Sequence, residues 1–229
     1  MVSQGSKTSS SGSEKTTAQR RAKARASGKG AGQGDSRRAR KSRPLDETSL
    51  RDLALSYVAR FATTGAKLEG YLARKLRERG IAEDEDGRVR ELDVTGLVTR
   101  LIELGYVDDD AYARMKTRDL TERGYGARRV EQALWAAGVE EHVREDNAPG
   151  EAQVRRAAIL LARKRRFGPY ARPPMDDGEP NAEERRKLRE KQVAAMLRAG
   201  HLYEHAAFIL DAASIDTVEE WLEEAEQDE

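Results

Sequence analysis

The sequence contains no cysteine, which excludes a disulfide framework, a thiol nucleophile and every cysteine-ligated zinc or iron–sulfur site. It has no apolar run near the roughly 18 residues that a membrane-spanning helix needs. Its first residues, MVSQGSKTSSSGSEKTT, lack the apolar region of a secretory signal. Aromatic residues make up only 5% of the chain and apolar residues 38%. We therefore expect a cytoplasmic protein without membrane contact, built from small modules instead of one thick core.

Charge is abundant and unevenly distributed. Charged residues make up 36% of the 229 residues, and the net charge is +1. Residues 1–44 contain twelve Lys or Arg against two acidic residues, a charge of +10 that leaves −9 on the rest of the chain. The last nineteen residues contain nine acidic residues and no Lys or Arg. Such asymmetry between the parts of a chain indicates electrostatic partners.

The segment 1–44 has almost no large apolar side chain to bury. Ordering it would cost about 1–2 kcal/mol per residue with nothing to offset the loss of entropy, so we predict a disordered basic tail. Its glycine-rich stretch at 28–34 lacks the Gly-Lys-Ser/Thr ending of a phosphate loop. Two interpretations stay open for this tail: a solubilising segment, or an arm that contacts the phosphates of DNA or RNA.

From residue 45 onward the apolar residues follow a helical period. One face runs from Leu50 to Phe61, a break follows at 63–65, and a stripe of leucines then ends at Gly80. No stretch alternates apolar and polar residues, so we expect an all-α protein of about eight to ten short helices. Three later helices carry cap signals: Asp108 alone, Asn181 with Glu184, and Asp216 with Glu219.

The helical pattern repeats along the chain. Leu68–Leu72 matches Val130–Leu134 at an offset of 62 residues, and Val193–Leu197 continues the series at 63. Three such matches predict a tandem array of helical modules. The predicted boundaries are a basic tail at 1–44, a first repeat with linker at 45–91, a second repeat at 92–149, a third repeat with a proline-rich connection at 150–212, and an acidic C-terminal helix and tail at 213–229.

Few residues are arranged as a catalytic or metal site would require. His201 and His205 are spaced i, i+4, which suits a shared metal ion, but no third ligand is evident, and both equally fit a helix start. No serine lies in a Gly-x-Ser-x-Gly turn. We expect no enzyme activity, no cofactor and no metal.

Basic clusters are the informative feature. No acidic residue interrupts the stretch from Arg155 to Arg172, where Phe167 and Tyr170 are interleaved with the cations. Guanidinium groups suit phosphates and carboxylates, and aromatic rings stack on bases. A solvated helix end whose aromatics enter the core is the alternative interpretation. The candidate contact residues are, first, Arg163, Lys164, Arg165 and Arg166, and then Arg128, Arg129, Arg155 and Arg156.

These segments resemble the RecX family of bacterial regulators of the RecA recombinase. The resemblance rests on LGYVDDDAYA at 104–113, RGYGARRV at 123–130, TTGAKL at 63–68, and RKRRFGPY at 163–170 with RAGH at 198–201, the last two being similar to alphaproteobacterial members. It covers about 47–212. The resemblance implies three tandem three-helix repeats in an elongated molecule, no catalysis, and binding to the RecA–DNA filament that most often inhibits strand exchange and the DNA-damage (SOS) response.

Three functions are compatible with the sequence. The first is a RecA-filament regulator that acts as a monomer on the filament and on single- or double-stranded DNA. The second is a helix-turn-helix transcription regulator with a recognition helix at 123–136. The third is a helical-repeat adaptor that binds a protein without DNA.

Overall fold

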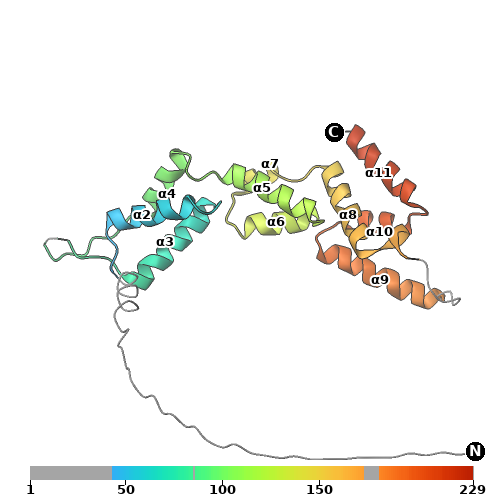
Figure 1. Cartoon of the computed structure of the whole chain (residues 1–229), viewed down its shortest axis with the longest axis horizontal. Coiled ribbons are helices and arrows are strands. Elements are labelled where there is room, and N and C mark those ends of the chain that lie inside the picture. The colour runs from blue at the N-terminus through green and yellow to red at the C-terminus, as the bar shows by residue number, and fades with distance from the viewer. Residues whose placement is uncertain (1–42, 85, 173–180, 229) are drawn as a thin grey trace, which may run out of the picture. The chain divides into compact units, whose positions relative to one another are not determined.

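The structure is a computed structural model that describes residues 43–84, 86–172 and 181–228 (Figure 1). In these residues every regular element is a helix, and extended pairing is limited to two isolated bridges, Leu45 with Ile81 and Glu83 with Val89. The predicted all-α class is confirmed. None of the helices in this part of the chain has the length and apolar character needed to cross a membrane. The predicted disorder of the basic tail concerns residues that, up to 42, lie outside the described ranges, as do 173–180 of the proline-rich connection.

The first unit consists of three helices: α2 (Glu47–Val58), α3 (Gly65–Arg79) and α4 (Val94–Glu103). Asp46 begins α2, because its carboxylate accepts the Ser49 backbone N–H while Ser49 Oγ accepts the N–H of Asp46. Thr64 caps α3 and Gly80 ends it, in agreement with the predicted break and stop. The buried side chains of this unit are Leu45, Leu50, Ala54, Leu68, Leu72, Val98, Leu101 and Val107.

The packing of α4 differs from the predicted boundary at residue 92. Val98 and Leu101 are buried with Leu50 and Leu68, so α4 completes the first unit. The predicted second repeat, at 92–149, therefore includes a helix that packs in the first unit. An apolar stripe shows that a helix is buried on one side, but it does not show which neighbour that side faces.

The second unit consists of α5 (Asp109–Glu122), α6 (Ala127–Trp135) and α7 (Glu141–Asp146). Asp108 caps α5 as predicted, since its Oδ1 accepts the Ala111 N–H at 2.8 Å. The sequence did not predict α7, because its six residues contribute one apolar side chain, Val143, to the core. The buried side chains of this unit are Tyr112, Ala113, Leu120, Val130, Leu134, Ala137 and Val139.

The third unit consists of α8 (Glu151–Arg165), the short 3-10 turn η1 (Gly168–Tyr170), α9 (Ala182–Arg198), α10 (Tyr203–Asp211) and α11 (Ile215–Gln227). The predicted capping box of Asn181 and Glu184 begins α9. The α11 helix lies against α8 (Figure 1) and buries Val218 and Trp221 in the core of this unit. It is therefore part of the third unit and not a separate C-terminal element, as the boundary at 213 had implied.

The start of α11 is a second difference from the sequence analysis. The predicted cap was Asp216 with Glu219, but the helix begins two residues earlier. Ser214 is the cap, and its Oγ accepts the Thr217 N–H at 3.1 Å. Serine and aspartate are comparable cap residues, so the cap pattern alone did not select between them.

Adjacent units are joined by one repeated contact. Thr64, which precedes α3, donates its hydroxyl to the Ala137 carbonyl at 2.5 Å. At the corresponding place before α6, the Gly126 N–H donates to the Ala199 carbonyl at 3.0 Å. Ala137 and Ala199 each lie in the turn after the second helix of the following unit. The same junction thus recurs at the offset of the sequence repeat, which supports a tandem array of three-helix units.

Candidate nucleic-acid interface

The basic residues at the end of α8 lie at the surface. Arg163, Lys164, Arg165 and Arg166 are all exposed. Arg163 is partly neutralised by Glu219 of α11, with 3.5 Å between Nη2 and Oε1, and its guanidinium lies over the Tyr170 ring. Lys164 donates Nζ to the Arg123 carbonyl at 3.2 Å and so reaches the second unit.

A groove opens beside this helix end, and we call it the junction groove. It is a hollow of about 400 Å³ between the α5–α6 turn, the end of α8 and the end of α9. Its lining includes four cationic side chains and no acidic one. The residues that line it are Arg123, Gly124, Tyr125, Leu161, Lys164, Arg165, Phe167, Ala195, Arg198 and Ala199. Cations from three helix ends therefore converge on one concave surface.

The second predicted cluster lies beside the same groove. Arg128 and Arg129 are exposed in the first turn of α6. The backbone N–H of Arg128 donates to the Gly200 carbonyl at 3.2 Å, so this turn rests on the end of α9. The guanidinium of Arg129 donates to Gln132 at 2.7 Å. The structure thus brings together two groups of candidates that are more than thirty residues apart in the sequence.

Close backbone contact fixes the geometry of the groove. A Cβ on Gly126 would lie 2.4 Å from the carbonyl carbon and oxygen of Gly200, and one on Gly124 would lie 3.3 Å from the Leu161 nitrogen. Gly124 also has φ +89°, which disfavours any other residue. Glycine is therefore required where the α5–α6 turn meets α8 and α9.

His201, in the third unit, forms a hydrogen bond to the α5–α6 turn of the second unit. Its side chain is fully buried, and Nε2 lies 3.0 Å from the Gly124 carbonyl. Burial lowers the pKa of the imidazole, so that it is neutral at pH 7 and donates to this carbonyl. His205 is buried as well, with Nε2 3.1 Å from a carboxylate oxygen of Glu151. Among the residues that the structure describes, no three His, Cys, Asp or Glu side chains are grouped to hold a metal ion. The two histidines have separate partners, the Gly124 carbonyl for His201 and Glu151 for His205.

Two of the sequence-predicted residues lie away from the groove. Arg155 donates Nε to Glu151 and Nη1 to the Trp221 carbonyl, both at 2.6 Å, and its guanidinium lies 4.5 Å from the Trp221 ring centroid. Arg156 is paired with Glu226. Both arginines hold α11 against α8, and their contact with a partner stays a prediction. Periodicity could not show this, because no sequence pattern linked α8 to α11.

Three groove residues were missed by the sequence analysis as contact candidates: Arg123, Tyr125 and Arg198. Arg123 and Arg198 each precede a helix-ending glycine, Gly124 and Gly200, at positions where cations suit the helix dipole. Their spacing relative to those glycines was the available signal. Tyr125 lines the groove and is 37% exposed.

Comparison with known proteins assigns the family. The model of the second three-helix domain of RecX matches residues 108–146. A regulatory protein RecX from Myxococcus xanthus is 32% identical to the chain over 177 residues, which cover 76% of this chain and 90% of that protein. The chain belongs to the RecX family. A regulatory protein RecX from Agrobacterium fabrum is 29% identical over 177 residues, covering 76% of this chain and 88% of that protein.

A RecX structure has the same fold. The crystal structure of RecX from Lactobacillus salivarius aligns with a TM-score of 0.51 and 19% sequence identity, covering 77% of this chain and 96% of that one. The RecX domain match includes the α5–α6 side of the junction groove, with Arg123 and Arg128, while the α8 and α9 sides lie outside it. The groove is therefore formed by two consecutive units of the RecX array.

Proposed function

We propose that this RecX-family protein regulates the RecA recombinase by binding the RecA–DNA filament, and that it inhibits strand exchange and the DNA-damage response. It acts by binding and not by turnover, in the cytoplasm, as a monomer and without a cofactor. Family membership supports a regulatory role, and the resemblance to RecX supports RecA as the partner. The observation that carries the site is the convergence of Arg123, Lys164, Arg165 and Arg198 on the junction groove.

The chemistry of the groove suits a nucleoprotein filament. Such a filament presents both phosphates and acidic side chains, and guanidinium groups bind either one in a bidentate manner. Lys164 and Arg165 are on α8, whereas Arg123 and Arg198 approach from the other two sides. A strand of phosphates in the groove would therefore contact cations on both walls, and Tyr125 offers an exposed ring for stacking.

The test is DNA-dependent ATP hydrolysis by the cognate RecA on single-stranded DNA, titrated with the protein. We expect the rate to fall at well below one protein per recombinase subunit. A version that starts at residue 45 would show what the basic tail adds. If the rate is unchanged at saturating protein while bare DNA is still bound, the RecA proposal fails and the transcription-regulator alternative gains support.

The groove itself is tested by charge reversal. The double variant Arg165→Glu and Arg198→Glu should weaken filament binding by at least about tenfold, since it removes cations from two walls of the groove. The matched control is Arg77→Glu with Arg88→Glu, which changes the net charge equally at exposed arginines outside the groove. Equal effects of the two double variants would exclude the groove as the contact surface and leave only a general charge effect.

A further inference from the structure

A second hollow lies in the first unit, far in sequence from the junction groove. It has a volume of about 620 Å³ between α2 and α4, and we call it the α2–α4 groove. Leucines form its floor and charged residues its rim. The residues that line it are Glu47, Leu50, Arg51, Leu55, Glu91, Leu92, Asp93, Gly96, Leu97, Arg100, Leu101, Leu104 and Tyr106. Leu104 is 51% exposed and Tyr106 57%, so an apolar edge faces solvent here.

In the third unit, the helix α11 occupies the place that corresponds to the α2–α4 groove. Trp221 of α11 stacks on Phe208 of α10 with ring centroids 4.6 Å apart and meets His205 edge-on at 5.4 Å. From the other side, the guanidinium of Arg155 covers the Trp221 ring. The tryptophan of an amphipathic helix therefore lies between the first and third helices of the unit, α8 and α10.

The equivalent position in the first unit can be assigned helix by helix. Both α2 and α8 begin with a glutamate, Glu47 and Glu151, and aligning these starts places the fully buried Ala54 on Ala158. The same alignment pairs residues that line the α2–α4 groove with residues that hold α11. These pairs are Glu47 with Glu151, Arg51 with Arg155, and Leu55 with Ile159.

The α4 side aligns in the same way. The buried residues Val98 and Leu101 of α4 have the spacing of Ala206 and Ile209 of α10. The residue just before each of these buried residues belongs to a second pair, which has the same three-residue spacing. On α4 that pair is Leu97 and Arg100, which line the groove, and on α10 it is His205 and Phe208, which contact Trp221.

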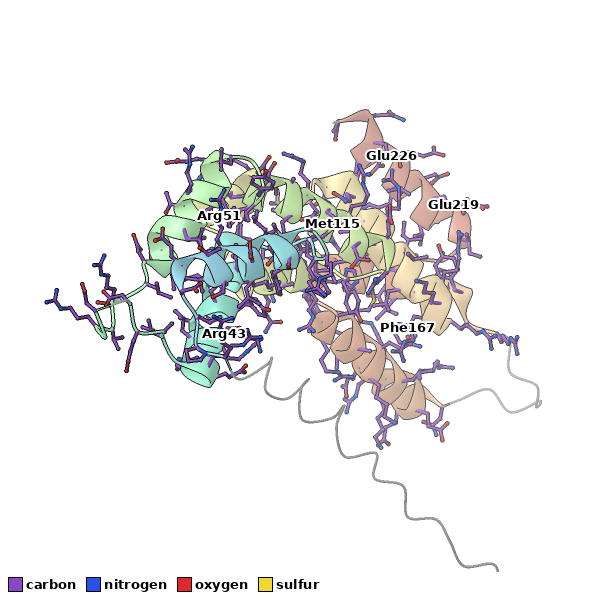
Figure 2. The ribbon with its side chains drawn as sticks, turned by 60° about the vertical axis from the view of Figure 1, so that its left-hand side comes forward. Arg43, Arg51, Met115, Phe167, Glu219 and Glu226 are labelled. Carbon is purple, nitrogen blue, oxygen red and sulfur yellow. The ribbon has the colours of Figure 1, made fainter. Side chains whose placement is uncertain are left out.

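From this correspondence we infer that the α2–α4 groove is a docking site for an amphipathic helix of a partner protein, seated as α11 is seated in the third unit. The partner helix carries a large apolar anchor where α11 has Trp221. The described residues of the first unit form the helices α2, α3 and α4 (Figure 1), with no fourth helix corresponding to α11 among them. Arg51, which corresponds to the arginine over Trp221, lies on the surface of α2 (Figure 2).

Charge distinguishes the partner helix from α11 of a second copy. On α8, Arg156 and Arg163 pair with Glu226 and Glu219, which project from α11 (Figure 2). The positions on α2 that correspond to these two arginines are Asp52 and Ala59. The rim adds three acidic residues, Glu47, Glu91 and Asp93, against two arginines, Arg51 and Arg100, and Arg100 is paired with Glu103. An acidic helix such as α11 meets acidic groups here, so the partner helix is basic on its flank.

The test uses two synthetic peptides and the full chain labelled with ¹⁵N. The first peptide has the sequence of residues 214–228, and the second carries Glu219→Lys, Glu223→Lys and Glu226→Lys, the three glutamates on the side of α11 that faces α8. We expect the basic peptide to bind saturably, with amide shifts confined to α2 and α4, and at least about tenfold more tightly than the acidic one. A third peptide, the basic one with Trp221→Ala, should lose this binding.

Variants of the chain complete the test. Leu104→Asp should weaken the basic peptide at least about tenfold, whereas Met115→Asp, a similarly exposed position on α5, should not. Asp52→Lys, at an exposed position of α2, should weaken binding of the basic peptide and strengthen binding of the acidic one. No saturable binding of the basic peptide, or shifts on α8 and α10 instead, would overturn the inference. Equal binding of the acidic peptide would make α11 of a second copy the occupant and would equally refute the basic partner.

Discussion

The junction between the second and third units predicts a large effect from one methyl group. Gly126 has φ −81° and ψ 171°, which alanine adopts without strain. The Cβ of Gly126→Ala, however, would lie 2.4 Å from two backbone atoms of Gly200 and 2.5 Å from the nitrogen of His201. Backbone atoms cannot rotate away as a side chain does, so the two units must separate. The perturbation therefore acts on packing and not on backbone conformation.

The magnitude follows from what the separation disrupts. Overpacking of this kind costs about 1–3 kcal/mol. The shift also disturbs the hydrogen bond from the Gly126 N–H to the Ala199 carbonyl, and a hydrogen bond contributes about 0.5–1.5 kcal/mol. We expect Gly126→Ala to lower the free energy of unfolding by about 2–4 kcal/mol. The matched control is Gly70→Ala in α3, where a Cβ meets nothing within 4 Å; it should raise stability by about 0.5–1 kcal/mol.

Urea unfolding provides the assay. The chain has two tryptophans. Trp221 is buried in the third unit and Trp135 is 68% exposed in the second, so the fluorescence change reports mainly the third unit. Far-UV circular dichroism follows the helices of the whole chain in parallel. If Gly126→Ala unfolds at the same urea concentration as the wild type, the close backbone contact does not exist in solution, and the geometry of the junction groove loses its basis.

Three further predictions concern packing, pH and salt. Trp221→Ala should lower the free energy of unfolding of the third unit by about 3–5 kcal/mol because a buried ring is lost. Trp135→Ala, at an exposed position, should change the free energy of unfolding by no more than about 0.5 kcal/mol. Burial lowers the pKa of His201 below its unfolded value. The neutral imidazole therefore contributes its full share to the free energy of unfolding above the unfolded pKa, near 6.5. This contribution is lost as the pH falls below that value toward the folded pKa, at up to about 1.4 kcal/mol per pH unit. Unfolding of His201→Gln at pH 7.5, 6.5 and 5.5 should show a shallower decline than the wild type, and parallel curves would contradict this assignment. In a salt titration of DNA binding, Lys164→Gln should reduce the slope of log K against log salt by about one if its ammonium contacts a phosphate, and an unchanged slope would exclude that contact.

Much of the fold could be predicted from the sequence, because helix ends depend on local chemistry. Asp108 and Asn181 cap the helices that they were predicted to cap, and Gly80 ends α3. The prediction was wrong for the start of α11, where two residues with equal cap propensity compete within three positions. It missed α7, which is too short to show a period. Local signals thus located most helices and left their partners undetermined.

The candidate site was less predictable, because it depends on which helix ends meet. Arg165 was predicted from the sequence as a contact residue, and the structure places it in a groove with Arg123 and Arg198. By contrast, Arg155 belongs to the same basic run but donates a hydrogen bond to the Trp221 carbonyl of α11. Charge density along a chain does not distinguish a cation that binds a partner from one that holds a neighbouring helix. That distinction required the tertiary contact between α8 and α11.

The α11 helix has a consequence for both proposed surfaces. By pairing with Arg156 and Arg163, its glutamates reduce the positive charge on one side of α8 and leave Lys164 and Arg165 at the junction groove. An acidic outer surface on α11 repels phosphates, so a nucleic-acid strand that approaches α8 is favoured on the groove side. The same helix fills, in the third unit, the site that is open in the first. The α11 helix thereby makes the third unit different from the first, which is why the two proposals assign phosphates to the junction groove and a basic helix to the α2–α4 groove.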